Sequence, residues 1–537
     1  MASGFGMKTY MKGAAILTIA SLLVKVLSAI YRVPFQNMVG DEGFYIYQQV
    51  YPFISIFVTW AAAGFAVAVS KLLADLSASD LPDVAERKRG MMQIVFGYLT
   101  ILSFIFFGAL FGGADILANY MGDAQLAPIL RTGSLIVLVM PALAMVKGDF
   151  QSRAMLSPIA YASVFEQFIR VCMILTGTFI IMRTSGSVYA AGHMAIAGTM
   201  VAEYIAFFAL FIFYRKSFQP ALRYAKPTMK RWPVIKEVTL LSLSVSMSSL
   251  LLLCYQLVDS FTIFNTLLEN GLVEQVAKET KGVYDRGQPL VQLGVVIASS
   301  LALAVVPLVA HMSKKTSKRG AIPFIQLTFR TSVLFGGAAA LGLVLVMHYI
   351  NQMLFQTDKL SEVLSLYVVQ IVPLSIVLTF TAILQGYGKL KWPAVILATG
   401  MFIKLIGNVT LVGPLGVLGA AIASNAGLFF SAIGLLIYIK KIISIQLATT
   451  TYYKKFAIAA GSMIVVVLLW TRIMEWLLGG VNGRTDAAII GMSAVLLGAF
   501  VMISLVAKMR VLSEKEWFLL PFGRKMAMYQ LWLNRKK

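Results

Sequence analysis

The chain has 537 residues, of which 59% are hydrophobic and only 13% charged, and its mean hydropathy is +0.82. So little charge cannot cover the surface of a soluble protein of this length. The net charge of +23 lies mainly in short loops between apolar runs, so membrane topology accounts for it and no nucleic-acid partner is expected.

Apolar runs long enough to cross a hydrocarbon core of about 30 Å recur along the chain. Lipid offers no partner for open backbone groups, so these runs must be helices. We expect an all-α integral membrane protein with about fourteen transmembrane helices. The predicted spans are 13–34, 48–70, 91–111, 127–146, 159–182, 189–213, 238–258, 288–311, 325–349, 363–386, 393–413, 415–439, 455–478 and 486–507.

The distribution of basic residues predicts the orientation. If the N-terminus is cytoplasmic, about 33 of the 46 Lys and Arg residues lie inside and about 7 lie in outer loops, which is the positive-inside pattern. The outer loop that carries Asp41 and Glu42 has almost no bases. We therefore expect a multi-pass protein of the cell membrane with both termini in the cytoplasm.

Sequence features recur at an offset of about 234 residues, which indicates a parallel repeat of two six-helix lobes. The matched segments are 148–151, Pro158 and Arg170 with 385–386, Pro393 and Lys404; 64–69 with 301–306; and 192–199 with 416–424. We expect an N-terminal lobe at 1–222, a C-terminal lobe at 223–445, two further helices within 446–510 and a basic cytoplasmic tail at 511–537. Two lobes around a cleft are typical of a transporter that works by alternating access.

Ionisable residues at membrane depth form the candidate site, because each costs several kcal/mol unless it is paired or faces water. These residues are Lys25, Glu166, Arg170, Glu203 and Lys404, with Arg32 and Asp259 nearer the span ends and Arg286 just before 288–311.

Glu166 and Arg170 have i,i+4 spacing and can pair on one helix face, either as a simple bridge or as a cavity wall in which Glu166 orients Arg170. Lys25 and Lys404 have no local acid and need a distant partner, water or a ligand. Alternatively, Lys25 pairs with Glu203, and Lys404 extends its amine toward the membrane surface.

The sum of these charges predicts a cationic cavity that attracts anions and rejects organic cations. Arg and Lys bind phosphate oxygens well, so a pyrophosphate headgroup fits. Arg170 and Lys404 hold corresponding places in the two lobes and could clamp one headgroup. Glu203 is the candidate proton or sodium site.

Other features exclude further chemistry. Cys172 and Cys254 lie inside apolar spans and are interpreted as packing residues, and the three histidines have no metal-ligand spacing. There is no phosphate-binding loop for a nucleotide, so neither a metal nor a cofactor is expected. The outer segment 265–280 has helical spacing of apolar residues and is either an amphipathic helix or a plain connector.

The stretches 25–34, 39–48 and 64–71 resemble the opening of the stage V sporulation protein B group. That group belongs to the polysaccharide-exporter branch of the multidrug/oligosaccharidyl-lipid/polysaccharide (MOP) flippase superfamily, which also contains the lipid II flippases. The resemblance implies a two-lobe fold, an undecaprenyl-pyrophosphate-linked substrate, and a groove for its lipid made by 455–478 and 486–507. It also implies that Lys25, Arg32 and Arg286 line the cavity, whereas Lys71 lies deeper toward the cytoplasm than the family pattern requires.

We therefore predict a flippase, not an enzyme, whose partners are a lipid-linked saccharide, membrane lipids and the cell-wall synthesis machinery. Three alternatives remain. The first is a drug or metabolite antiporter of the same superfamily, which predicts acid-dominated lobes. The second is an integral-membrane glycosyl polymerase, which needs catalytic acids in a large outer loop. The third is a scaffold without transport, which leaves the buried charges unexplained.

Overall fold

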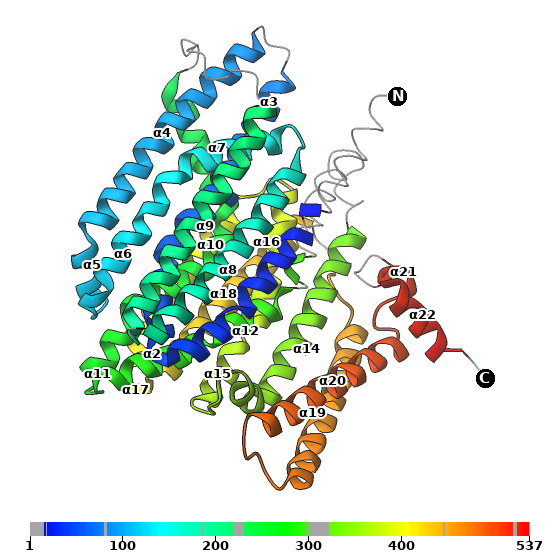
Figure 1. Ribbon diagram of the computed structural model, residues 1–537. Helices are drawn as coiled ribbons and strands as arrows, with labels where there is room; N and C mark the ends of the chain where they lie inside the picture. The colour runs from blue at the N-terminus through cyan, green and yellow to red at the C-terminus, as the bar shows by residue number, and fades with distance from the viewer. Residues whose placement is uncertain are drawn as a thin grey trace. The chain divides into compact units, whose positions relative to one another are not determined.

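The computed structural model describes residues 16–17, 19–79, 83–184, 186–217, 230–296, 298–300, 322–443, 446–518 and 523–535. Helices make up almost all of this part of the chain, and none of its residues belongs to a strand (Figure 1). The all-α membrane class predicted from the sequence is confirmed.

Twelve helical stretches of the described residues are long and apolar enough to cross a membrane. The first, Ile19–Ser77, is a helical stretch of 59 residues that overlaps two predicted spans and is kinked at Gly40. The predicted span 288–311 extends into residues that the structure does not describe. These two differences account for the step from about fourteen predicted spans to twelve. Each other predicted span overlaps one observed helical stretch, although some helices extend well beyond the predicted ends, as Arg231–Glu269 does for the predicted span 238–258.

Contact clustering divides the chain into two compact units. The first ends at Asp285 and also contains Leu390–Ala420. Its elements are α2 (Arg32–Thr59), the π-helix η1 (Trp60–Phe65), α3 (Ala66–Ser77), α4 (Val84–Gly112), α5 (Ala114–Tyr120), the 3-10 turn η2 (Ala124–Leu126), α6 (Ala127–Ser134), the 3-10 turn η3 (Leu135–Val139), α7 (Met140–Ser152), α8 (Leu156–Thr184), α9 (Val188–Ser217), α10 (Arg231–Glu269), α11 (Glu274–Asp285) and α17 (Lys391–Leu415).

The second unit contains Arg286–Lys389 and Ala421–Lys537. Its elements are α12 (Gly287–Gly294), α14 (Ile322–Phe355), α15 (Ser361–Val368), α16 (Ile371–Gly386), most of α18 (Val417–Ile443), α19 (Thr450–Leu478), α20 (Arg484–Lys508), α21 (Glu514–Trp517) and α22 (Gly523–Leu533). The predicted basic tail thus contains two short helices, and α22 packs against α20.

The observed units do not share boundaries with the predicted lobes. Helix α17 groups with the first unit because it packs along α10, whereas the predicted C-terminal lobe contains it. The local correspondence between α8 and α17 is present: each begins shortly after the preceding helix ends, with Pro158 or Pro393 in its first turn. The segment 301–306, which carries part of the predicted repeat, lies outside the described residues, so the lobes stay a prediction.

Gly40 interrupts the long first stretch and positions the residues around it. Its φ of 70° and ψ of −171° are non-helical values that glycine adopts without steric penalty. The expected outer loop at Asp41 and Glu42 is therefore a kink between two helical segments. Helix α11 packs on this kink, and a Cβ on Gly282 would lie 2.0 Å from the Asp41 carbonyl oxygen.

The expected amphipathic helix at 265–280 is wrong in its boundaries. Helix α10 continues to Glu269 and ends in a turn at Asn270 and Gly271, where φ is +85°. Helix α11 then begins at Glu274 and buries its second half, so it is a packed element of the first unit.

Candidate functional site

Lys25 lies in the apolar stretch that opens the chain, and its side chain is exposed. It makes no hydrogen bond or ion pair with any residue that the structure describes. The alternative that Lys25 pairs with Glu203 is wrong, because Glu203 bonds to Arg170. Within the part of the chain that the structure describes, Lys25 thus has no acid paired with it.

Arg32 opens α2 and is 1% exposed. Its guanidinium carbon lies 4.9 Å from the centre of the Tyr51 ring, close enough for a cation–π contact. The hydroxyls of Tyr31 and Tyr47 are hydrogen-bonded at 2.7 Å beside it. Arg32, the second base of the first helical stretch, therefore lies among aromatic side chains.

Arg170 on α8 is held between two acids. Its Nη2 donates to Glu203 Oε1 on α9 at 2.9 Å and also forms an ion pair with Glu166 Oε1. The predicted i,i+4 pair is confirmed, and the second acid adds to it. All three side chains are at most 13% exposed, so this triad carries one more acid than base.

Lys404 on α17 is fully buried and bonded across to α10. Its ammonium Nζ lies 2.7 Å from Asp259 Oδ1 and 3.3 Å from Asn408 Oδ1. Asn408 Nδ2 in turn donates to Asp259 Oδ1 and to Thr262 Oγ1, both at 2.8 Å. The alternative that Lys404 extends to the membrane surface is therefore wrong, and the distant partner that it required is Asp259.

A further ion pair, Lys281 with Asp285 on α11, was not among the predicted site residues. Lys281 Nζ donates to both carboxylate oxygens at 2.7 and 2.6 Å. Burial raises the pKa of Asp285 to about 6, and Asp259 acts in the same direction, while Lys281 and Arg32 oppose it. The signal was present in the sequence as a second i,i+4 pair of opposite charge, but it lay outside the apolar spans.

Buried bases and acids balance in this part of the first unit. Arg32, Arg170, Lys281 and Lys404 face the carboxylates of Glu166, Glu203, Asp259 and Asp285. The expected net positive charge is therefore not found among these eight residues, and Arg170 and Lys404 each have their own acids. Unlike Arg170 and Lys404, Lys25 forms no ion pair with an acid among the described residues.

The acids of the Gly40 kink are used in local bonds. Asp41 accepts a hydrogen bond from Gln36 Nε2 at 2.7 Å. The ammonium of Lys278 on α11 lies 3.8 Å from the carboxylate of Glu42 and 3.9 Å from that of Asp123. The contact of Glu42 with Lys278 joins α2 to α11, whereas the hydrogen bond from Gln36 to Asp41 lies within α2.

Arg286 begins the second unit and is 1% exposed. Its Nη1 donates to Asn351 Oδ1 on α14 at 2.9 Å, and its guanidinium carbon lies 4.7 Å from the centre of the Phe355 ring. Asn351 also donates to the Lys359 carbonyl oxygen and to Ser361 Oγ, both at 2.9 Å. Arg286 is thus held by polar and aromatic neighbours.

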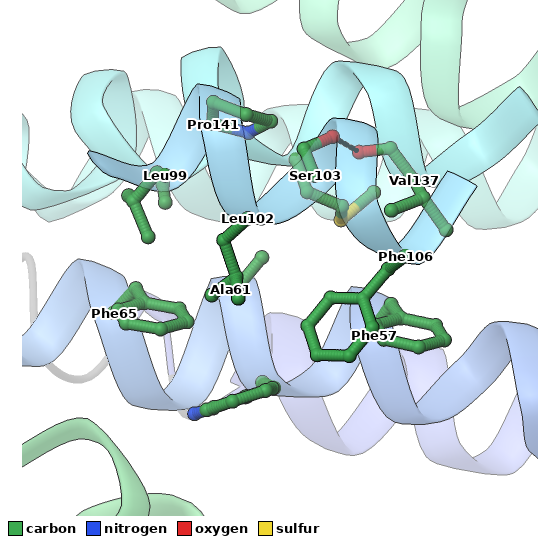
Figure 2. Close-up of a pocket in the computed structure, with 12 residues that line it drawn as sticks. Phe57, Ala61, Phe65, Leu99, Leu102, Ser103, Phe106, Val137 and Pro141 are labelled. Carbon is green, nitrogen blue, oxygen red and sulfur yellow. Dashed lines mark hydrogen bonds between the residues drawn. The ribbon is translucent and has the colours of Figure 1, made fainter. Parts of the chain in front are cut away.

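Two cavities, one in each unit, differ in size. The first, of about 30 Å³, lies beside η1 in the first unit; Figure 2 shows Phe57, Phe65 and Phe106 around it, with Ser103 bonded to the Val137 carbonyl oxygen at 2.6 Å. It has room for about one water molecule. The second, of about 460 Å³, lies in the second unit among α14, α19 and α20, is lined almost wholly by apolar atoms, and has Trp517 of α21 in its wall.

Comparisons with known proteins give the class. Residues 10–313 match the family described as "Polysaccharide biosynthesis protein", and residues 244–410 match the MatE family. The chain is 33% identical to the uncharacterized membrane protein YabM of Bacillus subtilis (strain 168) over 527 residues, 96% of each chain. It therefore belongs to the polysaccharide biosynthesis protein family and is a membrane transporter of the MOP superfamily.

Two further likenesses concern one kind of protein. The chain is 24% identical to the lipid II flippase MurJ of Bacillus subtilis (strain 168) over 528 residues, 91% of this chain and 94% of that protein. A structure of lipid II flippase MurJ in an inward closed conformation matches with a TM-score of 0.66 at 14% identity, covering 91% of this chain and 98% of that one. The structural match shows the fold.

Proposed function

We propose that this transporter is a flippase for an anionic lipid-linked saccharide, an undecaprenyl-pyrophosphate-linked precursor of peptidoglycan or polysaccharide. It would carry this substrate from the inner to the outer leaflet of the cell membrane by alternating access, without catalysing a reaction. The observation that carries the proposal is Lys25, an exposed base in an apolar span with no acidic partner among the described residues.

A lysine ammonium in hydrocarbon costs about 3 kcal/mol or more, so Lys25 must face water or an anion. A pyrophosphate offers oxygens that bind an ammonium strongly. Arg32 lies two helical turns further along the same stretch and supplies a second base of the kind that a diphosphate needs. We assign Lys25 and Arg32 to the headgroup.

The remaining candidate residues have positioning roles in this proposal. Arg170 is held by Glu166 and Glu203, so its charge is available to a headgroup only when one of these acids is protonated or withdrawn. This makes Glu203 the candidate coupling residue. Lys404 with Asp259 joins α10 to α17, and we assign that pair to the framework of the first unit.

The apolar cavity of the second unit supports a substrate with a long hydrocarbon chain. The cavity has a volume of about 460 Å³ and lies among α14, α19 and α20. The last two are the helices that follow the predicted lobes. Gly342 is on its wall, and a Cβ there would meet no atom within 4 Å. We propose that part of the polyprenyl chain occupies this cavity.

The test is flipping of a fluorescent polyprenyl-pyrophosphate disaccharide in proteoliposomes that contain the full chain. Wild type should move it, Lys25→Ala should reduce the rate at least tenfold, and Lys25→Arg should retain it because the charge remains. Lys389→Gln, which removes an exposed loop base, is the matched control. Equal rates for wild type and Lys25→Ala would contradict the proposal.

A second candidate function, export of an organic cation, is favoured by the balance of buried bases and acids in the first unit. That balance provides carboxylates that a cationic drug can use when their own bases move away. Transport of a cationic dye in the same proteoliposomes, with no movement of the pyrophosphate lipid, would support this candidate and exclude the flippase.

A further inference from the structure

The outer face of α22 combines exposed apolar side chains with exposed bases. Trp532, Met528 and Leu531 are 65%, 53% and 47% exposed. Two exposed bases, Arg524 and Lys525, lie in the first turn of the helix on this side, and a third exposed base, Arg535, follows the last helical residue, Leu533. The described residues from Gly523 to Arg535 contain no acid, so this face carries an undivided positive charge.

The opposite face of α22 fixes the helix to the second unit. Gly523, Ala527 and Gln530 are buried at helical spacing. Trp517 Nε1 donates to Gln530 Oε1 at 2.6 Å, and the hydroxyls of Ser504 and Tyr529 are hydrogen-bonded at 2.8 Å. The exposed bases and apolar residues are therefore held in a defined place at the end of α20.

That place is beside a membrane span. α20 ends at Lys508, and on the same helix Leu496 and Phe500 are 67% and 61% exposed. A span leaves such residues exposed where it faces lipid, and α22 packs against this span (Figure 1). The exposed Trp532 beside arginine and lysine has the composition of a helix that lies in the membrane interface.

We propose that α22 is an in-plane membrane-interface helix whose Arg524, Lys525 and Arg535 bind the headgroups of anionic phospholipids while Met528, Leu531 and Trp532 enter the acyl boundary. The continuity with lipid-exposed α20 and the excess of bases favour a bilayer over a protein partner. We take the combined attraction of the three bases as that of about one fully engaged base near an anionic membrane surface, which corresponds to about a fivefold enrichment of such lipids.

This lipid binding is a different function from the proposed transport, but Trp517 joins α22 to the wall of the apolar cavity. That side chain is 3% exposed, bonds to α22 through Gln530, and forms part of the wall of the apolar cavity. Trp517 belongs to the short helix α21, and the ion pair between Arg330 and Glu516 joins α21 to α14. A lipid that holds α22 in the interface therefore also holds the cavity wall in place.

The experiment uses the full chain in nanodiscs made from phosphatidylglycerol and phosphatidylcholine. Cys172→Ala and Cys254→Ala remove the free thiols, and Leu531→Cys carries an environment-sensitive fluorophore. In matched discs, either the phosphatidylglycerol or the phosphatidylcholine is brominated at equal mole fraction. We expect quenching by both lipids, with an excess of about fivefold in the contact probability of brominated phosphatidylglycerol.

Arg524→Gln with Lys525→Gln should remove more than half of that excess and leave the quenching by phosphatidylcholine in place. Lys389→Gln with Lys391→Gln removes the same charge from another exposed segment and should leave the excess unchanged. Equal quenching by the two lipids, a water-like emission without quenching, or an excess that persists in the α22 variant would each overturn the proposal.

Discussion

Separating the Lys404–Asp259 pair tests whether Lys404 belongs to the framework or to the substrate site. Lys404 is 0% and Asp259 5% exposed, and the ammonium and carboxylate are 2.7 Å apart. Lys404→Met leaves a buried carboxylate whose remaining donor among the described residues is the amide of Asn408, and an uncompensated buried charge costs about 3–5 kcal/mol. Asp259→Leu likewise removes the carboxylate and leaves the ammonium of Lys404 as an uncompensated buried charge.

The double variant Lys404→Met, Asp259→Leu should be within about 1 kcal/mol of wild type, because apolar side chains of similar volume replace a buried ion pair at little cost. The coupling between the two substitutions is then about 3 kcal/mol or more. Thermal midpoints of the four purified proteins in one detergent should place both single variants well below wild type and the double variant close to it.

Flipping by the double variant separates the two roles. If the pair is part of the framework, the double variant transports the pyrophosphate lipid at close to the wild-type rate. If Lys404 clamps the headgroup, as the sequence predicted, the double variant is stable but inactive. Additive effects of the two single substitutions on the thermal midpoint would refute the reasoning from the buried pair.

Three other predictions follow from the geometry. The pKa of Asp285 in the native state is about 6, against 3.8 for an unperturbed carboxyl, so the native state binds this proton more tightly than the unfolded state. The free energy of unfolding should therefore fall by up to about 3 kcal/mol as pH rises from about 4 to about 6. Asp285→Asn should flatten this part of the profile of thermal midpoint against pH. Gly282→Ala should lower the thermal midpoint by the equivalent of about 1–3 kcal/mol, since its Cβ would meet the Asp41 carbonyl oxygen, whereas Gly97→Ala, with nothing within 4 Å, should not; equal midpoints would contradict the close packing of α11. Gly342→Phe, at a position where a Cβ would meet no atom within 4 Å, should place a ring at the apolar cavity and reduce flipping of the long-chain lipid more than of a short-chain analogue; equal reduction of both would argue against a polyprenyl chain in this cavity.

The sequence was most informative about the membrane spans. Hydropathy alone predicted where most of them lie in the chain, because lipid requires every crossing segment to be an apolar helix, although it missed the full length of helices such as Arg231–Glu269. It also predicted the Glu166–Arg170 pair, since i,i+4 spacing places both side chains on one face of a helix. Local periodicity sufficed in both cases.

Contacts between distant segments were beyond this reasoning. Asp259 and Lys404 are 145 residues apart in the chain, so only the packing of α10 on α17 reveals them as partners. The same holds for Glu203, which the sequence offered as an alternative partner of Lys25 and which the packing of α9 on α8 places against Arg170. For this reason the sequence did not assign Asp259 to Lys404 or Glu203 to Arg170, and the expected positive cavity stays a prediction.

The most direct test of the central claim is the leaflet distribution of lipid-linked saccharides in cells depleted of this protein. An impermeant reagent that labels only outward-facing headgroups should show an anionic polyprenyl-linked precursor retained in the inner leaflet, and wild type, but not Lys25→Ala, should restore its labelling. Unchanged labelling of every such lipid on depletion, or full restoration by Lys25→Ala, would contradict the account.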